Sequence, residues 1–253
     1  MRILAHRGAP DRNGVENTVP AVAACLRAGA DGVEVDLRLS ADGVLVVCHD
    51  PDLLRLTGLP LPVASTSWDD LRAAADARGV PLARVEWMLA AMAGRPVVLE
   101  VKAPPPGPGS VQRTAIAVVE RLTVLRAAGL PLDVTVSSFA PVVVAAVRAK
   151  LPAQLGIRTA LLGRPTVRAA AVLRDGLAAG HDEIHPHIGA LLAEPGCVAA
   201  AHSCGVAVTA WTVNRSRALR RLASLGVDTV VTDVPVKAQA IATSTVSRHA
   251  ASA

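Results

Sequence analysis

The sequence predicts an α/β fold, a closed TIM (β/α)8 barrel. Eight short strand-like runs alternate with Ala- and Leu-rich helical stretches along the 253 residues. Such alternation implies a parallel sheet, and each unit takes about 32 residues, the size of a strand plus a returning helix. Eight units in a chain of this length match a closed barrel. The predicted strands are residues 3–6, 32–37, 97–102, 134–138, 154–159, 183–186, 207–213 and 228–232.

The helical stretches carry the periodicity of amphipathic helices. In the first, the apolar residues at positions 19, 22, 23 and 26 fall on one face. Asn17 or Thr18 can cap this helix and Gly29 can end it. The remaining predicted helices are residues about 84–93, 110–128, 141–150, 165–179, 191–203 and 215–225.

A β-hairpin interrupts the alternation after the second strand. Residues 33–39 and 44–49 both have strand character, but only 40–43 separate them. So short a connection cannot hold a crossover, so the pair must be antiparallel, and Asp42-Gly43 is a turn sequence. We expect the hairpin to extend the second strand beyond the barrel rim, with His49 opposite Glu34.

The composition of the chain indicates its domain organisation and disfavours some classes of binding partner. No shift in composition divides the chain, which predicts a single barrel domain over residues 1–242, and the small, polar segment 243–253 is predicted to be a disordered tail. The net charge is +5 without a basic run, and aromatic residues make up 2%. This disfavours nucleic-acid binding and is compatible with a small anionic substrate. The oligomeric state stays open.

The compartment is predicted from what the chain lacks. No apolar run approaches the ~18 residues that span a bilayer, and the N-terminus has no signal-peptide pattern. The four cysteines form no Cys-x-x-Cys pair, which disfavours a zinc knuckle and fits free thiols in a reducing compartment. We therefore expect a soluble, cytoplasmic protein without stable membrane insertion.

Acidic side chains lie on two neighbouring predicted strands. Glu34 and Asp36 are two residues apart and so share one face of a strand, as do Glu100 and Lys102. If that face lines the barrel, three carboxylates converge and repel one another. A hard divalent cation relieves the repulsion, and oxygen ligands favour Mg²⁺ or Ca²⁺ over zinc. The alternative is a buried ion network of these acids with Lys102 and Arg7.

Groups suited to phosphoryl chemistry stand at the same strand ends. His6 and Arg7 end the first strand, and His49 returns on the hairpin. A neutral imidazole takes up a proton while a protonated partner gives one to a leaving oxygen. Arg7 presents a planar fork to two phosphate oxygens, and Lys102 adds a point charge. Together with a cation these residues describe a site for a phosphoryl group.

The order of short motifs along the chain resembles the glycerophosphodiester phosphodiesterase family. The match runs from residue 5 to about 235. The motifs are Ala-His-Arg-Gly (5–8), Glu-Asn-Thr (16–18), Val-Glu-Val-Asp-Leu (33–37), Asp-Gly (42–43), His-Asp-Pro (49–51), Glu-Val-Lys (100–102), Ser-Phe (138–139), Trp-Thr-Val-Asn (211–214) and a closing segment from Gly-Val-Asp at 226–228 to 235.

The resemblance implies a barrel of the phosphodiesterase type and metal-dependent hydrolysis of glycerophosphodiesters to an alcohol and glycerol 3-phosphate. In the family, the commonly proposed route forms a cyclic phosphate through the glycerol 2-hydroxyl. The residues that the resemblance assigns are the metal ligands Glu34, Asp36 and Glu100, the acid–base pair His6 and His49, and the phosphate contacts Arg7 and Lys102.

Further residues of these motifs receive supporting roles. Glu16 is expected to orient His6 or to approach the metal, and Trp211 to wall the glycerol pocket. Ser138 and Phe139 are expected to shape the floor of the site. Asp50 and Asp233 are expected to hold loops by accepting backbone N–H groups.

Alternatives remain open at this stage. Lysophospholipase D-type or phosphoinositide-type cleavage would use the same motifs, and a non-catalytic barrel that binds phosphate esters would need no acid–base pair. The presence of both His6 and His49 disfavours the non-catalytic alternative. His185 and His187 are spaced like a metal-binding pair, but we expect His187 in a loop at the rim.

Overall fold

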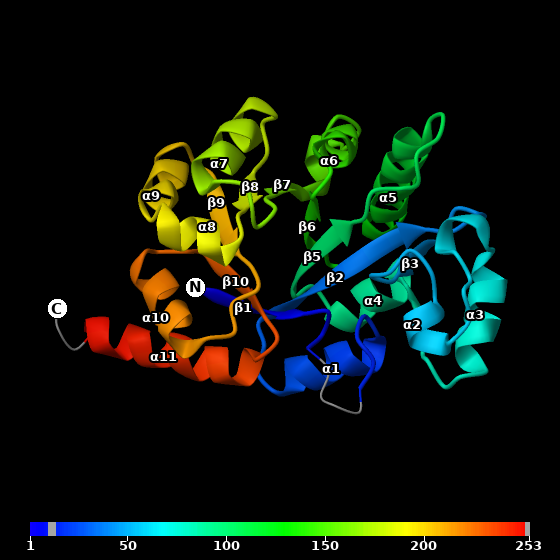
Figure 1. The fold of residues 1–253 in the computed structure, drawn as a ribbon, viewed down its shortest axis with the longest axis horizontal. Helices are drawn as coiled ribbons and strands as arrows, with labels where there is room; N and C mark the ends of the chain where they lie inside the picture. Colours follow the sequence, from blue (N-terminus) through cyan, green and yellow to red (C-terminus); the bar gives the residue numbers. More distant parts are fainter. Residues whose placement is uncertain (10–13, 251–253) are drawn as a thin grey trace.

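The computed structural model describes residues 1–9 and 14–250, with side chains up to residue 243. Within this part of the chain a sheet of ten strands closes on itself, because β1 pairs with both β2 and β10 (Figure 1). All strands of the closed barrel are parallel, which confirms the predicted TIM barrel. The barrel strands are Arg2–His6 (β1), Gly32–Leu39 (β2), Pro96–Val101 (β5), Asp133–Ser138 (β6), Arg158–Leu162 (β7), Glu183–His185 (β8), Ala207–Ala210 (β9) and Thr229–Thr232 (β10).

Helices surround the barrel and return the chain from one strand to the next (Figure 1). The first, α1, is capped by Thr18, whose side chain accepts a hydrogen bond from the backbone N–H of Ala21. The α-helices are Val19–Arg27 (α1), Leu54–Thr57 (α2), Trp68–Asp76 (α3), Val85–Met92 (α4), Ser110–Ala127 (α5), Pro141–Arg148 (α6), Ala169–Ala178 (α7), Ile188–Ala193 (α8), Gly196–Ser203 (α9), Ser216–Ser224 (α10) and Pro235–Ala250 (α11).

The main core lies between the outer face of the barrel and this ring of helices. Strands of a parallel barrel are covered on both faces and therefore read as nearly continuous apolar runs, as in β5. Val97 and Leu99 of this strand face Val118 and Leu122 of α5 in a single cluster of buried side chains. Each fully buried side chain of this size stabilises the fold by roughly 1.5–3 kcal/mol.

The rim hairpin is present, but its register differs from the prediction by one residue. β3 (Leu45–Val47) pairs antiparallel with β2 so that Leu37 lies opposite Val47. The turn is set by the backbone N–H of Ser40, which donates to the carbonyl of Val44, and by Gly43, whose φ of 83° suits a residue without a Cβ. The ladder therefore ends before His49, which does not lie opposite Glu34.

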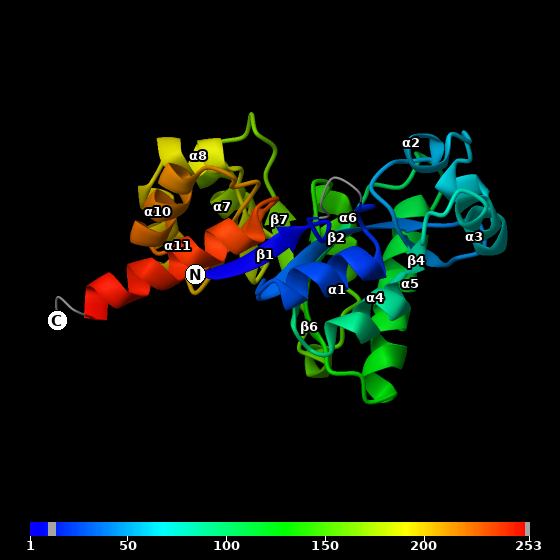
Figure 2. The ribbon, with the colours of Figure 1, turned by 90° about the horizontal axis from the view of Figure 1, so that it is seen from below.

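A third rim strand, which the sequence did not predict, completes this extension. β4 (Ala83–Arg84) pairs with β3, and with α2 and α3 it forms a unit at one end of the molecule, opposite α8 and α9 (Figures 1 and 2). Trp68 and Leu71 of α3 pack with Val46 of β3 in a separate small core. This core holds the hairpin, and with it His49, over the barrel mouth.

Two predicted elements are displaced for local reasons. The strand predicted at residues 154–159 begins at Arg158, because Ala153–Leu155 form a 3₁₀ turn that Gly156 ends in the left-handed conformation. The helix predicted at residues 191–203 is divided into α8 and α9, because Pro195 interrupts it. α11 continues to Ala250, through part of the segment predicted as a tail, and residues 251–253 lie outside the described chain.

The strand registers place inward-facing side chains in layers. Barrel strands are tilted, so side chains at one height come from alternate strands with an offset of two residues. At one level the registers bring together Glu34, Ser137, His185 and Val231. The level above it, at the mouth, contains His6, Glu100, Leu162 and Trp211.

A buried ion-pair cluster occupies the lumen near the opposite end of the barrel. Glu183 is 4% exposed, and its carboxylate accepts hydrogen bonds from Arg158 Nε at 2.8 Å and Thr135 Oγ1 at 2.9 Å. His185 Nε2 lies 3.2 Å from its other oxygen. Burial alone would raise the pKa of Glu183, but these partners outweigh it and lower the pKa to about 2.

Among the described residues, no helix has both the length and the apolar character needed to cross a bilayer.

Replacement of Glu183 by Gln is expected to lower the free energy of unfolding at pH 7 by about 2 kcal/mol, because charge-assisted hydrogen bonds are lost. A carboxyl whose pKa is depressed in the folded state contributes stability above its unfolded pKa of ~4.3 and loses it as the pH falls. The stability difference between wild type and variant should therefore shrink from about pH 4.5 toward pH 2. Urea unfolding across this range measures it, with the exposed Glu120→Gln as control; a constant difference would contradict the assignment.

Candidate active site

The loop after β1 turns sharply at the barrel mouth. Arg7, Gly8 and Ala9 all have positive φ, at 53°, 79° and 41°. At Gly8 a Cβ would lie 3.1 Å from the backbone nitrogen of Val22, so the loop packs directly on α1. A left-handed conformation is unfavourable for Arg7, and strained residues of this kind are concentrated at functional sites. The turn directs the Arg7 side chain back over the barrel.

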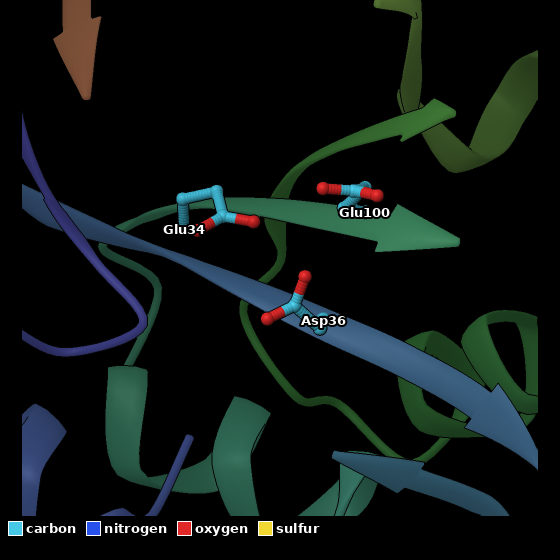
Figure 3. Close-up of side chains that lie close together, drawn as sticks. All are labelled: Glu34, Asp36 and Glu100. Carbon is cyan, nitrogen blue, oxygen red and sulfur yellow. The ribbon is translucent and has the colours of Figure 1, made fainter. Parts of the chain in front are cut away.

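Three carboxylates converge at the mouth, as the sequence predicted (Figure 3). Glu34 and Asp36 project from β2 and Glu100 from the neighbouring β5, where Glu100 is aligned with Asp36. Each side chain is buried, and their ligand atoms all lie within 4.8 Å of one another. So close a set of acids needs positive charge to be stable in the ionised form.

Lys102 and Arg7 both bring positive charge to Asp36, and Lys102 also contacts Glu100. Lys102 Nζ lies 2.7 Å from Asp36 Oδ1 and 2.5 Å from Glu100 Oε1, and Arg7 Nε lies 3.4 Å from Asp36 Oδ2. Burial tends to raise the pKa of Asp36, but the charges of Lys102 and Arg7 outweigh it and lower the pKa. The same carboxylates raise the pKa of Lys102 against the effect of burial. These pairs are part of the buried ion network that was the alternative interpretation of the sequence.

Neither Lys102 nor the Arg7 side chain forms such a close pair with Glu34, which has only His6 at 3.9 Å. Burial, followed by the charge of Asp36, raises the pKa of Glu34 to about 8. Burial also raises the pKa of Glu100, although Lys102 opposes it. Two acids are thus held toward their neutral forms at a point where all three oxygen donors face one another. This donor set fits a hard divalent cation, which would replace the protons and allow all three carboxylates to ionise.

Asn17 fixes the position of Asp36. Its side-chain amide donates to Asp36 Oδ2 at 2.8 Å, and its oxygen accepts from the Asp36 backbone N–H at 3.1 Å. Asn17 is 2% exposed and has a φ of 59°. It is therefore not the cap of α1, a role that belongs to Thr18, but a residue that orients a carboxylate of the acidic cluster.

His6 is held by a carboxylate from the far end of the chain. Its Nδ1 lies 2.7 Å from Asp233 Oδ1, which directs Nε2 toward Glu34 Oε2 at 3.9 Å. Burial disfavours the charged imidazole, but the hydrogen bond with Asp233 and the charge of Glu34 raise the pKa of His6 overall. Asp233 also accepts a hydrogen bond from the Asn214 side chain at 2.6 Å, so its carboxylate holds two side chains rather than the backbone N–H groups that the sequence predicted.

His49 is held in the same way by its neighbour. His49 Nδ1 lies 2.8 Å from Asp50 Oδ1, and Arg55 donates to the other Asp50 oxygen at 2.5 Å. Arg55 also donates to Glu16 Oε1 at 2.6 Å, and Arg7 donates to the same oxygen at 3.1 Å. Glu16 therefore orients Arg7 and contacts Arg55 of α2, whereas the sequence predicted that it orients His6 or approaches the metal.

These groups surround one cavity of about 270 Å³. Trp211 and Phe139 form one wall, with ring centroids 5.1 Å apart in an edge-to-face arrangement. Trp211 is fixed by a hydrogen bond from Nε1 to the carbonyl of His185 at 3.0 Å. Ser137 lines the cavity, whereas the predicted Ser138 does not and instead donates to the carbonyl of Val101.

The structure brings the predicted site residues together. The cavity is lined by His6, Arg7, Glu34, His49, Glu100, Lys102 and Trp211, with Asp36 directly beside Glu34 and Glu100. The sequence did not indicate Arg55, the role of Asn214, or the orienting roles of Asp50, Asp233 and Asn17. The last three lie inside the quoted motifs or their closing segment, but a motif does not reveal which side chain faces which.

His187 and His185 do not act as a metal-binding pair. His187 stands at the rim as expected, where its Nδ1 accepts from the backbone N–H of Gly189 at the start of α8. His185 is 1% exposed and points into the lumen.

Comparison with known proteins gives a family match over nearly the whole chain. The model of the "Glycerophosphoryl diester phosphodiesterase family" matches residues 6–237. Among solved structures, a glycerophosphodiester phosphodiesterase from Parabacteroides distasonis has the same fold with a TM-score of 0.79 at 22% identity, covering 97% of this chain and 98% of that one. A phosphodiesterase from Oleispira antarctica, in complex with the product sn-glycerol-3-phosphate, gives a TM-score of 0.77 at 24% identity over 95% and 96% of the two chains.

Similarity to curated sequences is concentrated in shorter stretches. The glycerophosphodiester phosphodiesterase of Bacillus altitudinis is 41% identical over 71 residues, which are 28% of this chain and 29% of that protein. The chain aligns with about a third or less of the length of the first curated relatives that it matches.

Replacement of Asp233 by Asn is expected to lower the pKa of His6, because the hydrogen bond and negative charge that favour the imidazolium are removed. NMR titration of the imidazole signals in metal-free protein measures the shift. Asp50→Asn is the matched control, since it removes the partner of His49 and should leave the His6 titration in place. An unchanged or higher His6 pKa in Asp233→Asn would contradict the role of this carboxylate.

Proposed function

Because the chain belongs to the glycerophosphoryl diester phosphodiesterase family, we propose that it hydrolyses glycerophosphodiesters to an alcohol and glycerol 3-phosphate with the help of Mg²⁺ or Ca²⁺. The observation that carries the proposal is the set of groups around one small cavity: two imidazoles, an arginine and a lysine beside three clustered carboxylates. The Oleispira antarctica phosphodiesterase, which shares the fold, binds sn-glycerol-3-phosphate as product. That compound is the expected product here.

The cation would be held by Glu34, Asp36 and Glu100. When bound, a divalent cation supplies positive charge that stabilises the developing negative charge on phosphoryl oxygens. The protein's own contribution is the geometry of the ligands. Asn17 fixes Asp36, and Lys102 remains between Asp36 and Glu100 as a permanent positive charge.

Arg7 and Lys102 are suited to hold the phosphodiester itself. Arg7 lines the cavity and its guanidinium is anchored, because Nη1 donates to Glu16 and Nε lies 3.4 Å from Asp36 Oδ2. The anchoring leaves the guanidinium little freedom, so the phosphate is oriented by a rigid donor rather than a mobile one.

His6 and His49 provide the proton transfers. Each has Nδ1 engaged with a carboxylate, Asp233 or Asp50, so Nε2 of each is directed away from that partner and both rings line the cavity. One imidazole removes a proton from the attacking hydroxyl or water, and the other donates one to the leaving alcohol oxygen. The carboxylate partners hold the rings in position.

A lysophospholipase D activity is a second candidate because of a groove beside the site. The groove has a volume of about 840 Å³ and shares Lys102 with the catalytic cavity. Its walls include Pro104–Pro106, Ile116 and Val124, which could accommodate an acyl chain. A lysophospholipase D from Mus musculus is 39% identical to this chain over 71 residues. A phosphoinositide-type cleavage has no comparable observation in its favour.

Replacement of Glu34 by Gln should reduce turnover of glycerophosphocholine at saturating Mg²⁺ by at least about 10²-fold, because the amide cannot complete the three-carboxylate donor set. Removal of the metal from wild-type protein by a chelator should have a similar effect, reversed by added Mg²⁺ or Ca²⁺. Release of glycerol 3-phosphate is measured with an enzyme-coupled assay, and circular dichroism checks the fold of the variant. Full activity after metal removal would contradict the proposed dependence of the reaction on a cation.

Replacement of His6 or His49 by Asn should lower kcat by roughly 10²–10⁴-fold, because each variant loses one proton-transfer group. His187→Asn, at the rim, is the matched control and should retain activity. A non-catalytic barrel that binds phosphate esters predicts instead that the wild type binds glycerol 3-phosphate and turns over no diester with any of Mg²⁺, Ca²⁺ or Mn²⁺.

A comparison of kcat/KM on two substrates separates the two candidate activities. With glycerophosphocholine and lysophosphatidylcholine as substrates, the main proposal predicts higher kcat/KM for the water-soluble diester. Preference for the lysophospholipid, together with loss of that preference in Ile116→Glu in the groove, would favour the lysophospholipase D activity.

A further inference from the structure

The floor of the catalytic cavity is polar where a barrel of this kind is usually packed with apolar side chains. The layer below the mouth consists of Glu34, Ser137, His185 and Val231, and all four line the cavity. Bulky branched residues dominate such layers in TIM barrels. Glu34 belongs to the acidic cluster, but Ser137 and His185 have no part in the groups that would hold the cation or the phosphate.

We propose that Ser137 and His185 form a subsite that binds the terminal hydroxyl of the glycerol moiety, the one remote from the phosphate. This inference rests on the proposed function and assigns the part of the substrate that enters the closed end of the cavity.

The unpaired hydroxyl of Ser137 is the first observation that supports the subsite. It is 0% exposed, and its Oγ has no hydrogen-bond partner in the protein. Leaving a buried hydroxyl unpaired costs roughly 1–3 kcal/mol, and such groups are rare without a functional reason. The neighbouring Ser138 is equally buried but donates to the carbonyl of Val101 and accepts from the backbone N–H of Ala140. The missing partner is therefore specific to the hydroxyl that faces the cavity.

The position of His185 is the second observation that supports the subsite. Its Nε2 faces Glu183 at 3.2 Å, and Glu183 is held ionised by Arg158 and Thr135. With Nε2 directed at this carboxylate, Nδ1 is the ring nitrogen left for a ligand in the cavity. Because His185 lines the cavity, a hydroxyl that enters there can hydrogen-bond to Nδ1 and to Ser137 Oγ, on the next strand but one.

The shape of the cavity decides which part of the substrate reaches this pair. Below the polar layer the lumen is closed by Leu4 and Val98, which pack with Val231. The alcohol that leaves a glycerophosphodiester varies in size, so it must point toward the open mouth and the groove beyond Lys102. The glycerol is small and constant. Its carbon chain can pack on Leu162 and Val98, which also line the cavity.

The test compares glycerophosphocholine with its deoxy analogue, in which hydrogen replaces the terminal glycerol hydroxyl and the 2-hydroxyl is kept. Wild type should prefer glycerophosphocholine by at least about tenfold in kcat/KM, because a site that pairs a hydroxyl rejects the analogue without it. Ser137→Ala should lose about fivefold or more on glycerophosphocholine and less than about twofold on the analogue. His185→Gln, which keeps a donor toward Glu183 but lacks Nδ1, should behave in the same way.

Ser138→Ala is the matched control. It removes a buried hydroxyl that faces away from the cavity, so it should lower thermal stability and keep the wild-type substrate preference. Ser137→Ala should not be destabilised, since its hydroxyl has no partner to lose. Retention of the wild-type preference in Ser137→Ala overturns the subsite.

A binding measurement separates failure of the subsite from failure of the proposed function. Calorimetry with Mg²⁺ present compares sn-glycerol 3-phosphate with propane-1,2-diol 1-phosphate, which lacks the terminal hydroxyl. Suppose that no diester is hydrolysed, but that wild type binds sn-glycerol 3-phosphate at least about fivefold more tightly than propane-1,2-diol 1-phosphate and Ser137→Ala does not. This result would support the subsite and contradict the catalytic function. Equal affinities, or no binding of either compound, overturn the subsite.

Discussion

The burial of three carboxylates at one point is the constraint on which the rest of the site depends. Glu34, Asp36 and Glu100 come within 4.8 Å of one another in a barrel mouth largely shielded from water, where like charges repel strongly. Lys102 and Arg7 lower the pKa of Asp36, whereas burial and the nearby charge of Asp36 raise the pKa of Glu34 to about 8. The clustering of these carboxylates is therefore electrostatically unfavourable without a cation, and a divalent cation would stabilise it.

A second ring of interactions turns this cluster into an oriented site. The imidazoles of His6 and His49 are each hydrogen-bonded to a carboxylate, and Glu16 links Arg7 to Arg55 on the rim unit. The members of this ring come from the β1 loop, the hairpin and the segment after β10. Closure of the barrel through the β1–β10 pairing is what brings Asp233 beside His6. Loss of that pairing would release the imidazole as well as open the sheet.

The shear of the barrel decides which inward-facing side chains meet. The tilt places residues from alternate strands at one height, so Glu34 shares a layer with Ser137 and His185 although they lie far apart in the chain. The same tilt places different groups of polar side chains at different heights in the lumen. The mouth and the layer beneath it hold the acidic cluster and the imidazole of His6, and the ion pair of Arg158 with Glu183 lies deeper. The hydrogen bond between His185 and Glu183 links these levels.

The sequence by itself determined the barrel and the chemistry of its mouth. Strand–helix alternation needs only local periodicity, and Glu34 and Asp36 share a face because strand side chains alternate. It did not determine the start of β7, the break at Pro195 or the hairpin register, since these depend on single turns and on packing of the rim. The partners of His6 and His49, the place of Glu16 behind Arg7, and the unpaired Ser137 were decided by tertiary structure alone. Hydrogen bonds between residues as distant as 6 and 233 follow from barrel closure and strand tilt, and these arise from the pairing of all strands together rather than from any segment.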